Sequence, residues 1–259
     1  MIEFFLNDRA KQNFAENNLN TFQLIWTLDT GWYEDRNIRR GGWSGVSRYK
    51  MINNNAIFIK RQENHCHRAW NTFFKLVPTF NREFENIQKF TRLGIPTLEV
   101  LYFGQRNVKS KLQAILVTEE LEGFLPLDSD VLKRKLSNDI KFRKGAIQKI
   151  AEAVSNMHEQ HLQHNCLYEK HIFLKQLKDG DVDVRLIDLE KVKGVIFRRQ
   201  AMYRDLGALY RHSEGWSKID YLRFFLYYQK EQRLSVRSKK MLTFFLKKVK
   251  NKINKKHKL

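Results

Sequence analysis

Cysteine is scarce in this chain of 259 residues, and long apolar runs are absent. Cys66 and Cys166 alone give no disulfide framework, which predicts a reducing compartment. No stretch approaches the roughly 18 consecutive apolar residues that a membrane-spanning helix needs. The N-terminal segment has neither a basic leader nor a long apolar run, so we do not expect a secreted protein. Together these absences predict a cytoplasmic protein.

The motifs of several enzyme classes are also missing. No Gly-x-Ser-x-Gly nucleophile elbow and no dinucleotide-binding glycine pattern occurs, which removes the common hydrolase and dehydrogenase signatures. The 42% hydrophobic and 13% aromatic content is typical of a globular chain. The length suits one large two-lobed domain or two ordinary ones.

Acidic residues are missing from the C-terminal end, and the positive charge is concentrated there. The formal net charge of +20 comes from 48 Lys or Arg against 28 Asp or Glu, and 11 of the basic residues lie within 232–259, which contains no acid. The apolar residues of this stretch fall largely on one helical face, which predicts a basic amphipathic tail over 236–259. Three interpretations stay open: a helix docked on the domain, attraction to anionic lipid or phosphorylated glycolipid, and nucleic-acid binding. The last is the least favoured, because no zinc pattern or RNA-binding motif accompanies the charge.

The N-terminal half alternates between helical and strand patterns. Residues 1–30 predict a helical extension, and 36–60 predict strand, turn, strand and strand, interrupted by Gly41, Gly42 and Gly45. This glycine density is typical of a hairpin that covers phosphate groups, since backbone without side chains approaches phosphate oxygens closely. A glycine-rich hairpin with no ligand stays open as the alternative.

A strand lysine and a helix glutamate form the next pattern. Lys60 ends an apolar run, as the strand-borne lysine of a kinase N-lobe does, and a helix is predicted over 78–94. Glu83 or Glu85 of that helix is positioned to pair with Lys60 and hold it against phosphate groups. We favour Glu83, because apolar residues follow it at four and seven positions.

Two more strands are predicted over 97–106 and 112–121, and the second runs into a linker at 119–123. The backbone amide and carbonyl of such a linker are able to hydrogen-bond to an adenine edge. The ordinary end of an edge strand fits these residues equally well. Residues 128–139 are then expected to be a charged connector, and 142–161 a long amphipathic helix. His158 of that helix is predicted to be a packed core residue.

The most informative segment is 157–175, followed by 184–191. A helix end, a His-centred loop, a strand, a turn and a strand ending in Asp188 is the order in which kinase-like folds assemble catalytic and metal-binding residues. A protein kinase has His-Arg-Asp in this loop, with Asn five residues after that Asp. Here the corresponding residues are His164, Asn165, Cys166 and His171.

These patterns resemble the lipopolysaccharide kinase (Kdo/WaaP) family, in detail its InaA-type branch, within the protein-kinase-like superfamily. The similarity covers about residues 30–230 and rests on the order of seven blocks rather than on any one of them. The blocks are RRGGWSGV (39–46), IFIKR (57–61), NREFENIQKFTRLGIP (81–96), ILVTEELEG (115–123), MHEQHLQHNCLYEKHIFL (157–174), IDLEK (187–191) and RDLGALY (204–210).

The resemblance implies an α+β, protein-kinase-like two-lobed fold, with an antiparallel-sheet N-lobe and a mostly helical C-lobe. We expect the N-lobe with its hinge over 31–123 and the C-lobe over 124–235. It also implies ATP and Mg²⁺ as cofactors. The residues implied for nucleotide are Gly41, Gly42, Gly45, Lys60 with its partner Glu83, and Glu119 and Leu121 of the hinge.

In the C-lobe, the resemblance implies a structural role for His164 and a metal-binding role for His171 and Asp188, although Leu189 and Glu190 replace the usual Phe-Gly after that Asp. Asp205 resembles the buried acid that braces a kinase catalytic loop.

Cys166 departs from the pattern of the sugar-kinase members, which have Asp there, whereas the InaA-type branch is similar in having Cys. A thiol replaces a carboxylate base near neutral pH only if its pKa, ordinarily about 8.5, is depressed. Three alternatives therefore stay open: a slow kinase, a kinase with another base such as Glu169, and a pseudokinase that binds nucleotide or a partner. The resemblance implies phosphate transfer to a sugar of lipopolysaccharide core at the cytoplasmic face of the inner membrane.

Overall fold

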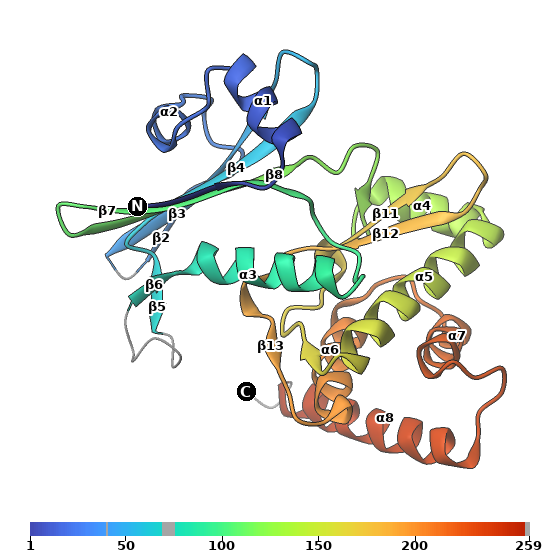
Figure 1. Cartoon of the computed structure of the whole chain (residues 1–259). Coiled ribbons are helices and arrows are strands. Elements are labelled where there is room, and N and C mark those ends of the chain that lie inside the picture. Colours follow the sequence, from blue (N-terminus) through green and yellow to red (C-terminus); the bar gives the residue numbers. More distant parts are fainter. Residues whose placement is uncertain (40, 69–75, 257–259) are drawn as a thin grey trace. The chain divides into compact units, whose positions relative to one another are not determined.

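The computed structural model describes residues 1–39, 41–68 and 76–256 (Figure 1). Arg40 of the predicted glycine hairpin and residues 257–259 of the predicted tail lie outside the described residues. The chain divides into two compact units. The N-terminal unit comprises residues 1–89 and 98–122, and the C-terminal unit comprises residues 90–97 and the chain from 123 onward.

The N-terminal unit is built on an antiparallel six-stranded sheet with the order β1-β7-β8-β4-β3-β2. Figure 1 shows helices α1 and α2 on one face of this sheet and α3 on the other. The strands are β1 (Ile2–Phe5), β2 (Asn37–Arg39), β3 (Gly42–Lys50), β4 (Ala56–Glu63), β7 (Val100–Val108) and β8 (Lys111–Glu119), with β5 (Cys66–Arg68) and β6 (Leu76–Pro78) as a separate pair. The helices are α1 (Asp8–Glu16), α2 (Phe22–Thr27) and α3 (Thr79–Arg92).

Helices on both faces explain why the central strand β8 is buried over most of its length. On one face, Phe14 and Phe22 of α1 and α2 join Tyr102 of β7 in the main aromatic core. On the other, the ring of Phe84 on α3 stacks on Phe103 of β7 with centroids 4.4 Å apart. This packing fixes α3, which carries Glu83, against the sheet that carries Lys60.

The expectation of an N-terminal helical extension is incomplete, because the chain begins with strand β1. Its Cα register pairs Ile2 with Gln105, and Glu3 accepts a hydrogen bond of 2.9 Å from the Tyr102 hydroxyl. A four-residue strand is too short for its periodicity to be recognised, so pairing with β7 decides its structure. The two predicted helices follow as α1 and α2.

The C-terminal unit is mostly helical, with two small antiparallel sheets. Its helices are α4 (Asp130–Asn138), α5 (Ile140–Glu159), α6 (Arg198–His212), α7 (Lys218–Gln229) and α8 (Val236–Lys256), with single 3₁₀ turns at Glu169–His171 and Leu189–Lys191. The strands are β9 (Leu125–Pro126), β10 (Leu162–Gln163), β11 (Ile172–Gln176), β12 (Val182–Leu186) and β13 (Lys193–Gly194). The predicted order of helix end, loop, strand, turn and strand is present as α5, the loop after it, β11 and β12.

The predicted charged connector over 128–139 is wrong, because most of it forms helix α4. Ser129 caps the helix by accepting a hydrogen bond of 3.3 Å from the Leu132 N–H. Leu132 is only 1% exposed and anchors the helix. A single buried leucine among charged residues gives little periodic signal, so the cap and this contact were not evident from the sequence.

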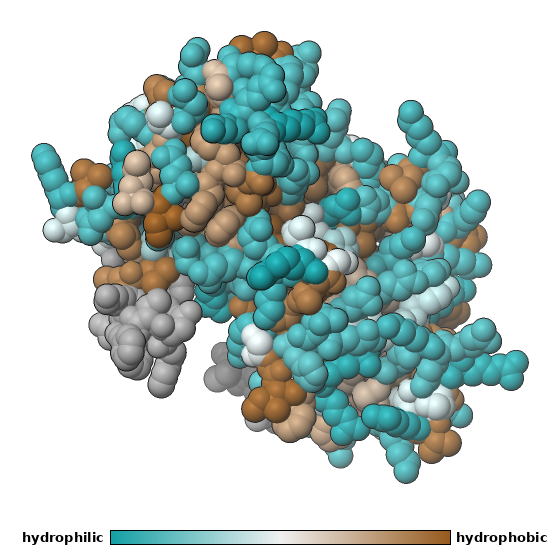
Figure 2. Space-filling view, in the orientation of Figure 1, coloured by the Kyte–Doolittle hydropathy of each residue, from teal (hydrophilic) through white to brown (hydrophobic). Residues whose placement is uncertain are grey.

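The predicted basic tail forms helix α8, whose apolar side packs on α6. Phe245 and Val249 are buried, and the Phe245 ring stacks on Tyr203 of α6 with centroids 6.4 Å apart. In the view of Figure 2, hydrophilic side chains surround smaller hydrophobic patches where Figure 1 shows α6 and α8. This packing favours the docked-helix interpretation. Across the described ranges, no helix combines the length and hydropathy needed to cross a bilayer.

Candidate active site

In the N-terminal unit, Lys60 of β4 and Glu83 of α3 form the ion pair that the sequence predicts. Lys60 Nζ lies 2.5 Å from Glu83 Oε1. Glu83 is only 2% exposed, and a carboxylate buried to that extent requires a cationic partner. Glu85, the alternative, is exposed and accepts a hydrogen bond from Asn81 instead. The register of β4 between β3 and β8 fixes the direction of the lysine.

The segment after β8 has a free backbone donor at the predicted hinge. The Glu119 N–H donates to Glu99 O at 3.0 Å, and the Glu120 N–H donates to Ala56 O at 2.9 Å. The Leu121 N–H, by contrast, makes no hydrogen bond within the ranges that the structure describes. A half-buried amide without an internal partner is suited to an external acceptor.

The predicted phosphate-covering glycines have packing roles of their own. A Cβ at Gly42 would meet the Asn64 backbone at 2.4 Å, and one at Gly45 would meet the Trp32 ring at 2.5 Å. Gly41 has φ +75°, a conformation that favours glycine in a tight turn. These contacts account for the glycines, so their role toward phosphate stays a prediction.

In the C-terminal unit, the catalytic loop is held by Asp205 of α6. Its two carboxylate oxygens accept hydrogen bonds from the His164 N–H at 2.6 Å and the Asn165 N–H at 2.9 Å. Asp205 is fully buried, and Asn165 has φ +67°. The bonds hold the loop in a backbone conformation that a non-glycine residue rarely adopts. This is the bracing role that the family resemblance implies.

His164 connects the loop to the strand end that carries Asp188. Its Nε2 lies 3.1 Å from the Ile187 carbonyl, and its Nδ1 lies 3.3 Å from the Cys166 N–H. A carbonyl only accepts and an amide only donates, so we assign the proton to Nε2. Burial lowers the pKa of His164, which agrees with a neutral ring.

Cys166 is 7% exposed and lies beside Lys191 of the 3₁₀ turn after Asp188. Burial raises the pKa of its thiol, and the hydrogen bond and positive charge of Lys191 act in the opposite direction without reversing the change. This change favours the protonated thiol near neutral pH, the opposite of what a general base requires. Sequence reasoning missed Lys191, because a lysine three residues after Asp188 has no periodic signal of its own.

His171 and Asp188 form the candidate metal site. His171 Nδ1 donates to the Cys166 carbonyl at 2.7 Å, which turns Nε2 toward Asp188 Oδ2 at 3.2 Å. In the neutral ring both of these atoms are acceptors, so together they are suited to hold a metal ion. Asp188 has φ +59° and ψ +56°, a strained conformation of the kind that occurs at functional sites.

The donor set at His171 and Asp188 fits a divalent metal that also binds phosphate. Within the described part of the chain, no cluster of three or more His, Cys, Asp or Glu could complete a metal cage. A metal held by one or two side chains takes its other ligands from substrate phosphates and water, which is usual for Mg²⁺ in phosphotransferases.

Glu169, the alternative base, faces a different part of the C-terminal unit. Its carboxylate lines a cavity of 280 Å³ with Lys133 and Trp216, and the Glu214 N–H approaches it at 3.5 Å. Burial raises the pKa of Glu169 to about 7. No hydrogen bond among the described residues links this carboxylate to Cys166 or Asp188, so Glu169 as the base stays a prediction.

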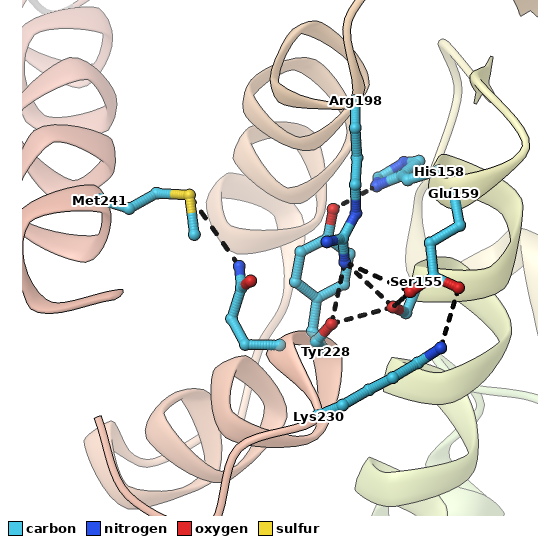
Figure 3. Close-up of polar contacts among 8 residues, drawn as sticks. Ser155, His158, Glu159, Arg198, Tyr228, Lys230 and Met241 are labelled. Atoms are coloured by element: carbon cyan, nitrogen blue, oxygen red, sulfur yellow. Dashed lines mark hydrogen bonds and ion pairs between the residues drawn. The ribbon is translucent and has the colours of Figure 1, made fainter. Parts of the chain in front are cut away.

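A buried polar network joins helices α5 and α7 (Figure 3), and Asp205 of α6 extends it through His158. His158 Nε2 lies 3.2 Å from Asp205 Oδ2, and His158 Nδ1 lies 2.9 Å from the Tyr228 hydroxyl. The Tyr228 carbonyl in turn accepts from the Ser155 hydroxyl at 2.9 Å and from Arg198 at 3.0 Å. His158 is thus the packed core residue predicted from the sequence. Its contact with Asp205 depends on the crossing of α5 and α6 and has no sequence signal.

Comparisons with known proteins agree with this arrangement. The model of the lipopolysaccharide kinase (Kdo/WaaP) family matches residues 23–228. Protein InaA of Escherichia coli (strain K12) is 28% identical over 208 residues, which cover 80% of this chain and 94% of InaA. A solved structure, WaaP in complex with acyl carrier protein, is similar with a TM-score of 0.68 and 18% identity, covering 97% of this chain and 99% of WaaP. This structural likeness confirms the kinase-like fold class, and the extent of the family match confirms the family. The chain belongs to the lipopolysaccharide kinase (Kdo/WaaP) family.

Proposed function

We propose that this protein is an ATP- and Mg²⁺-dependent phosphotransferase that acts on a sugar of lipopolysaccharide core at the cytoplasmic face of the inner membrane. The observation that carries the proposal is the Lys60–Glu83 ion pair, with its 2.5 Å contact, in a chain of this family. Such a pair holds a lysine ready for the α- and β-phosphates of a nucleotide.

Each unit has groups that suit a different part of this reaction. Lys60, held by Glu83, supplies positive charge to the nucleotide phosphates, and the free Leu121 N–H is a donor for adenine. His171 and Asp188 would hold the metal, which supplies charge neutralisation for the transferred phosphoryl group. Asp205 holds the loop at His164, and His164 in turn contacts the strand end before Asp188.

The missing base lowers the expected rate without forbidding the reaction. Phosphoryl transfer passes through a loose transition state that depends mainly on positioning and charge neutralisation. A positioned general base contributes about 10²- to 10⁴-fold. Because the Cys166 thiol is protonated near neutral pH, the acceptor hydroxyl has to release its proton to water or to phosphate oxygens. We therefore expect a slow kinase.

A second function is favoured by the same thiol. A buried thiol in place of the catalytic Asp is also expected in a pseudokinase. Such a protein would bind nucleotide or a partner in an envelope stress response. The kinase and a nucleotide-binding pseudokinase agree in nucleotide binding and differ in turnover, whereas a partner-binding pseudokinase has neither.

The test is transfer of labelled γ-phosphate from ATP to dephosphorylated lipopolysaccharide core, measured with wild type and with Asp188→Asn. Slow transfer that requires a divalent metal and is lost in Asp188→Asn supports the kinase. ATP binding without transfer supports the pseudokinase. Absence of ATP binding in the wild type refutes both nucleotide-dependent functions.

A further inference from the structure

A second charged cavity lies in the C-terminal unit, between α6 and α8. It has a volume of 480 Å³, and it contains none of the residues assigned above to nucleotide or metal. Three cationic side chains line it and no acidic one does. The lining residues are Gln200, Tyr203, Arg204, Arg211, Phe245, Lys248, Val249 and Asn251.

The helical periodicity of α6 brings its two arginines to one wall of the cavity. Arg204 and Arg211 are seven residues apart, close to two full turns, so they lie on the same face. Arg211 folds back along its own helix, since a Cβ at Gly207 would lie 3.2 Å from Arg211 Nη1. Glycine at 207 therefore leaves room for the guanidinium to lie against α6. Lys248 adds a third positive charge from α8.

The two guanidinium groups have no acidic partner in the described part of the chain. No ion pair or hydrogen bond of the Arg204 or Arg211 side chain is present there, and Lys248 instead lies 4.7 Å from the Tyr203 ring centroid. Burial and the neighbouring charge of Arg204 lower the pKa of Arg211. A half-buried guanidinium next to a like charge is unfavourable unless an anion compensates it.

We propose that this cavity binds a phosphate ester, with Arg204, Arg211 and Lys248 holding the phosphate. Guanidinium groups pair with phosphate through two parallel N–H···O bonds, and lysine adds a point charge. Tyr203 and Phe245 form an apolar wall against which the organic part of the ester packs. The proposal does not depend on nucleotide turnover.

The experiment compares two double variants that remove equal charge from the same two helices. Arg211→Gln with Lys248→Gln empties the cavity of two cations, whereas Arg199→Gln with Lys240→Gln removes two exposed cations that do not line it. Inorganic pyrophosphate is titrated calorimetrically without divalent metal, in a Lys60→Ala background that disables the candidate nucleotide site. We expect the cavity variant to lose about tenfold or more in affinity, which is about 1.4 kcal/mol or more, and the control to stay within about twofold.

Vesicles of phosphatidylcholine with a minority of phosphatidic acid form the second arm, with pure phosphatidylcholine as reference. If the wild type sediments with the phosphatidic acid vesicles and the cavity variant does not, the phosphate belongs to a lipid headgroup. If the wild type binds pyrophosphate but does not sediment, the phosphate belongs to a soluble ester. Arg204→Gln, an exposed position, repeats the test if the double variant fails to fold. Equal binding by wild type and cavity variant, equal loss in both double variants, or binding of duplex oligonucleotide alone overturns the proposal.

Discussion

The two units of this protein differ in how far their candidate site residues match the pattern of a kinase. The N-terminal unit has its lysine and glutamate paired at 2.5 Å, with the carboxylate buried. The catalytic loop of the C-terminal unit keeps its brace, Asp205, and its metal pair, yet a buried thiol stands where the proton acceptor is expected. Under the proposed function, the charged groups for nucleotide and metal are present, and the carboxylate for proton transfer is absent. The proposal therefore predicts that nucleotide binding and proton transfer are separable in this chain.

The largest effect is expected at the residues that hold nucleotide and metal. ATP with Mg²⁺ should raise the melting temperature of the wild type, and Lys60→Ala or Asp188→Ala should abolish that rise. At ATP concentrations about a hundred times the Kd, the lost stabilisation is about 2.7 kcal/mol. Differential scanning fluorimetry measures it.

The matched control for this measurement is Lys50→Ala, an exposed lysine of the neighbouring strand β3. Lys60→Ala leaves Glu83 buried without its partner, so the same shift is also measured with Glu83→Gln added. An ATP-induced shift that persists unchanged in the Lys60 and Asp188 variants would show that these residues do not hold the nucleotide. Absence of a shift in the wild type would assign the protein to the partner-binding pseudokinases.

The next largest effect is expected at the lost base. Cys166→Asp restores an acceptor for the substrate proton, and Lys191 beside it favours the ionised carboxylate. We expect turnover to rise about 10²-fold, the lower end of what a general base contributes. Steady-state ATP turnover measures it.

Cys166→Asn and Cys166→Ala are the controls, because they change shape without adding a base, and both should stay close to wild type. A large loss of turnover in Cys166→Ala would instead make the thiol a participant in the chemistry.

The comparison of the units also explains what the sequence was able to predict. Lys60 and Glu83 were predictable because strand and helix periodicity each aim a side chain in a known direction. The helix, loop, strand and strand around Asp188 were predictable from their order along the chain. Local patterns are sufficient when one element determines the direction of a residue.

The features that were missed depend on contacts between elements. Lys191 reaches Cys166 only through the 3₁₀ turn after Asp188, and His158 meets Asp205 only where α5 and α6 cross. Strand β1 and helix α4 likewise owe their structure to a sheet partner and to one buried leucine. Such contacts have no fixed spacing in the sequence, so periodicity does not reveal them.

A smaller effect concerns the acid sensitivity of the loop brace. Burial lowers the pKa of His158, so the folded protein keeps this ring neutral where the unfolded chain, with a pKa of about 6.5, takes up a proton. The unfolded state then binds more protons, and stability falls as the pH drops below about 6.5. At most, one such histidine lowers the free energy of unfolding by about 1.4 kcal/mol for each pH unit below that value.

His158→Gln keeps a side-chain donor for Asp205 and removes the titration. The pH dependence of the free energy of unfolding, measured by urea denaturation between neutral and mildly acidic pH, should become flatter by about that amount. Identical pH profiles for wild type and His158→Gln would show that His158 does not contribute to the pH dependence of the free energy of unfolding.

The smallest effect is expected in the preference of ATP binding for Mn²⁺ or Mg²⁺. It tests whether His171, which differs from the Asn of protein kinases, binds the metal. His171 replaces the Asn of protein kinases, so the site offers an imidazole nitrogen and a carboxylate oxygen 3.2 Å apart. Mg²⁺ prefers oxygen ligands, whereas imidazole nitrogen suits transition metals better. Mn²⁺ should therefore support ATP binding better than Mg²⁺ in the wild type.

His171→Asn, which restores an oxygen ligand, should shift the ratio of ATP affinities toward Mg²⁺ by about fivefold, roughly 1 kcal/mol. Titrations of ATP in each metal measure the ratio, and Lys170→Asn, an exposed neighbour, is the control. A ratio that does not move in His171→Asn would mean that the imidazole is not a ligand and that Asp188 binds the metal without it.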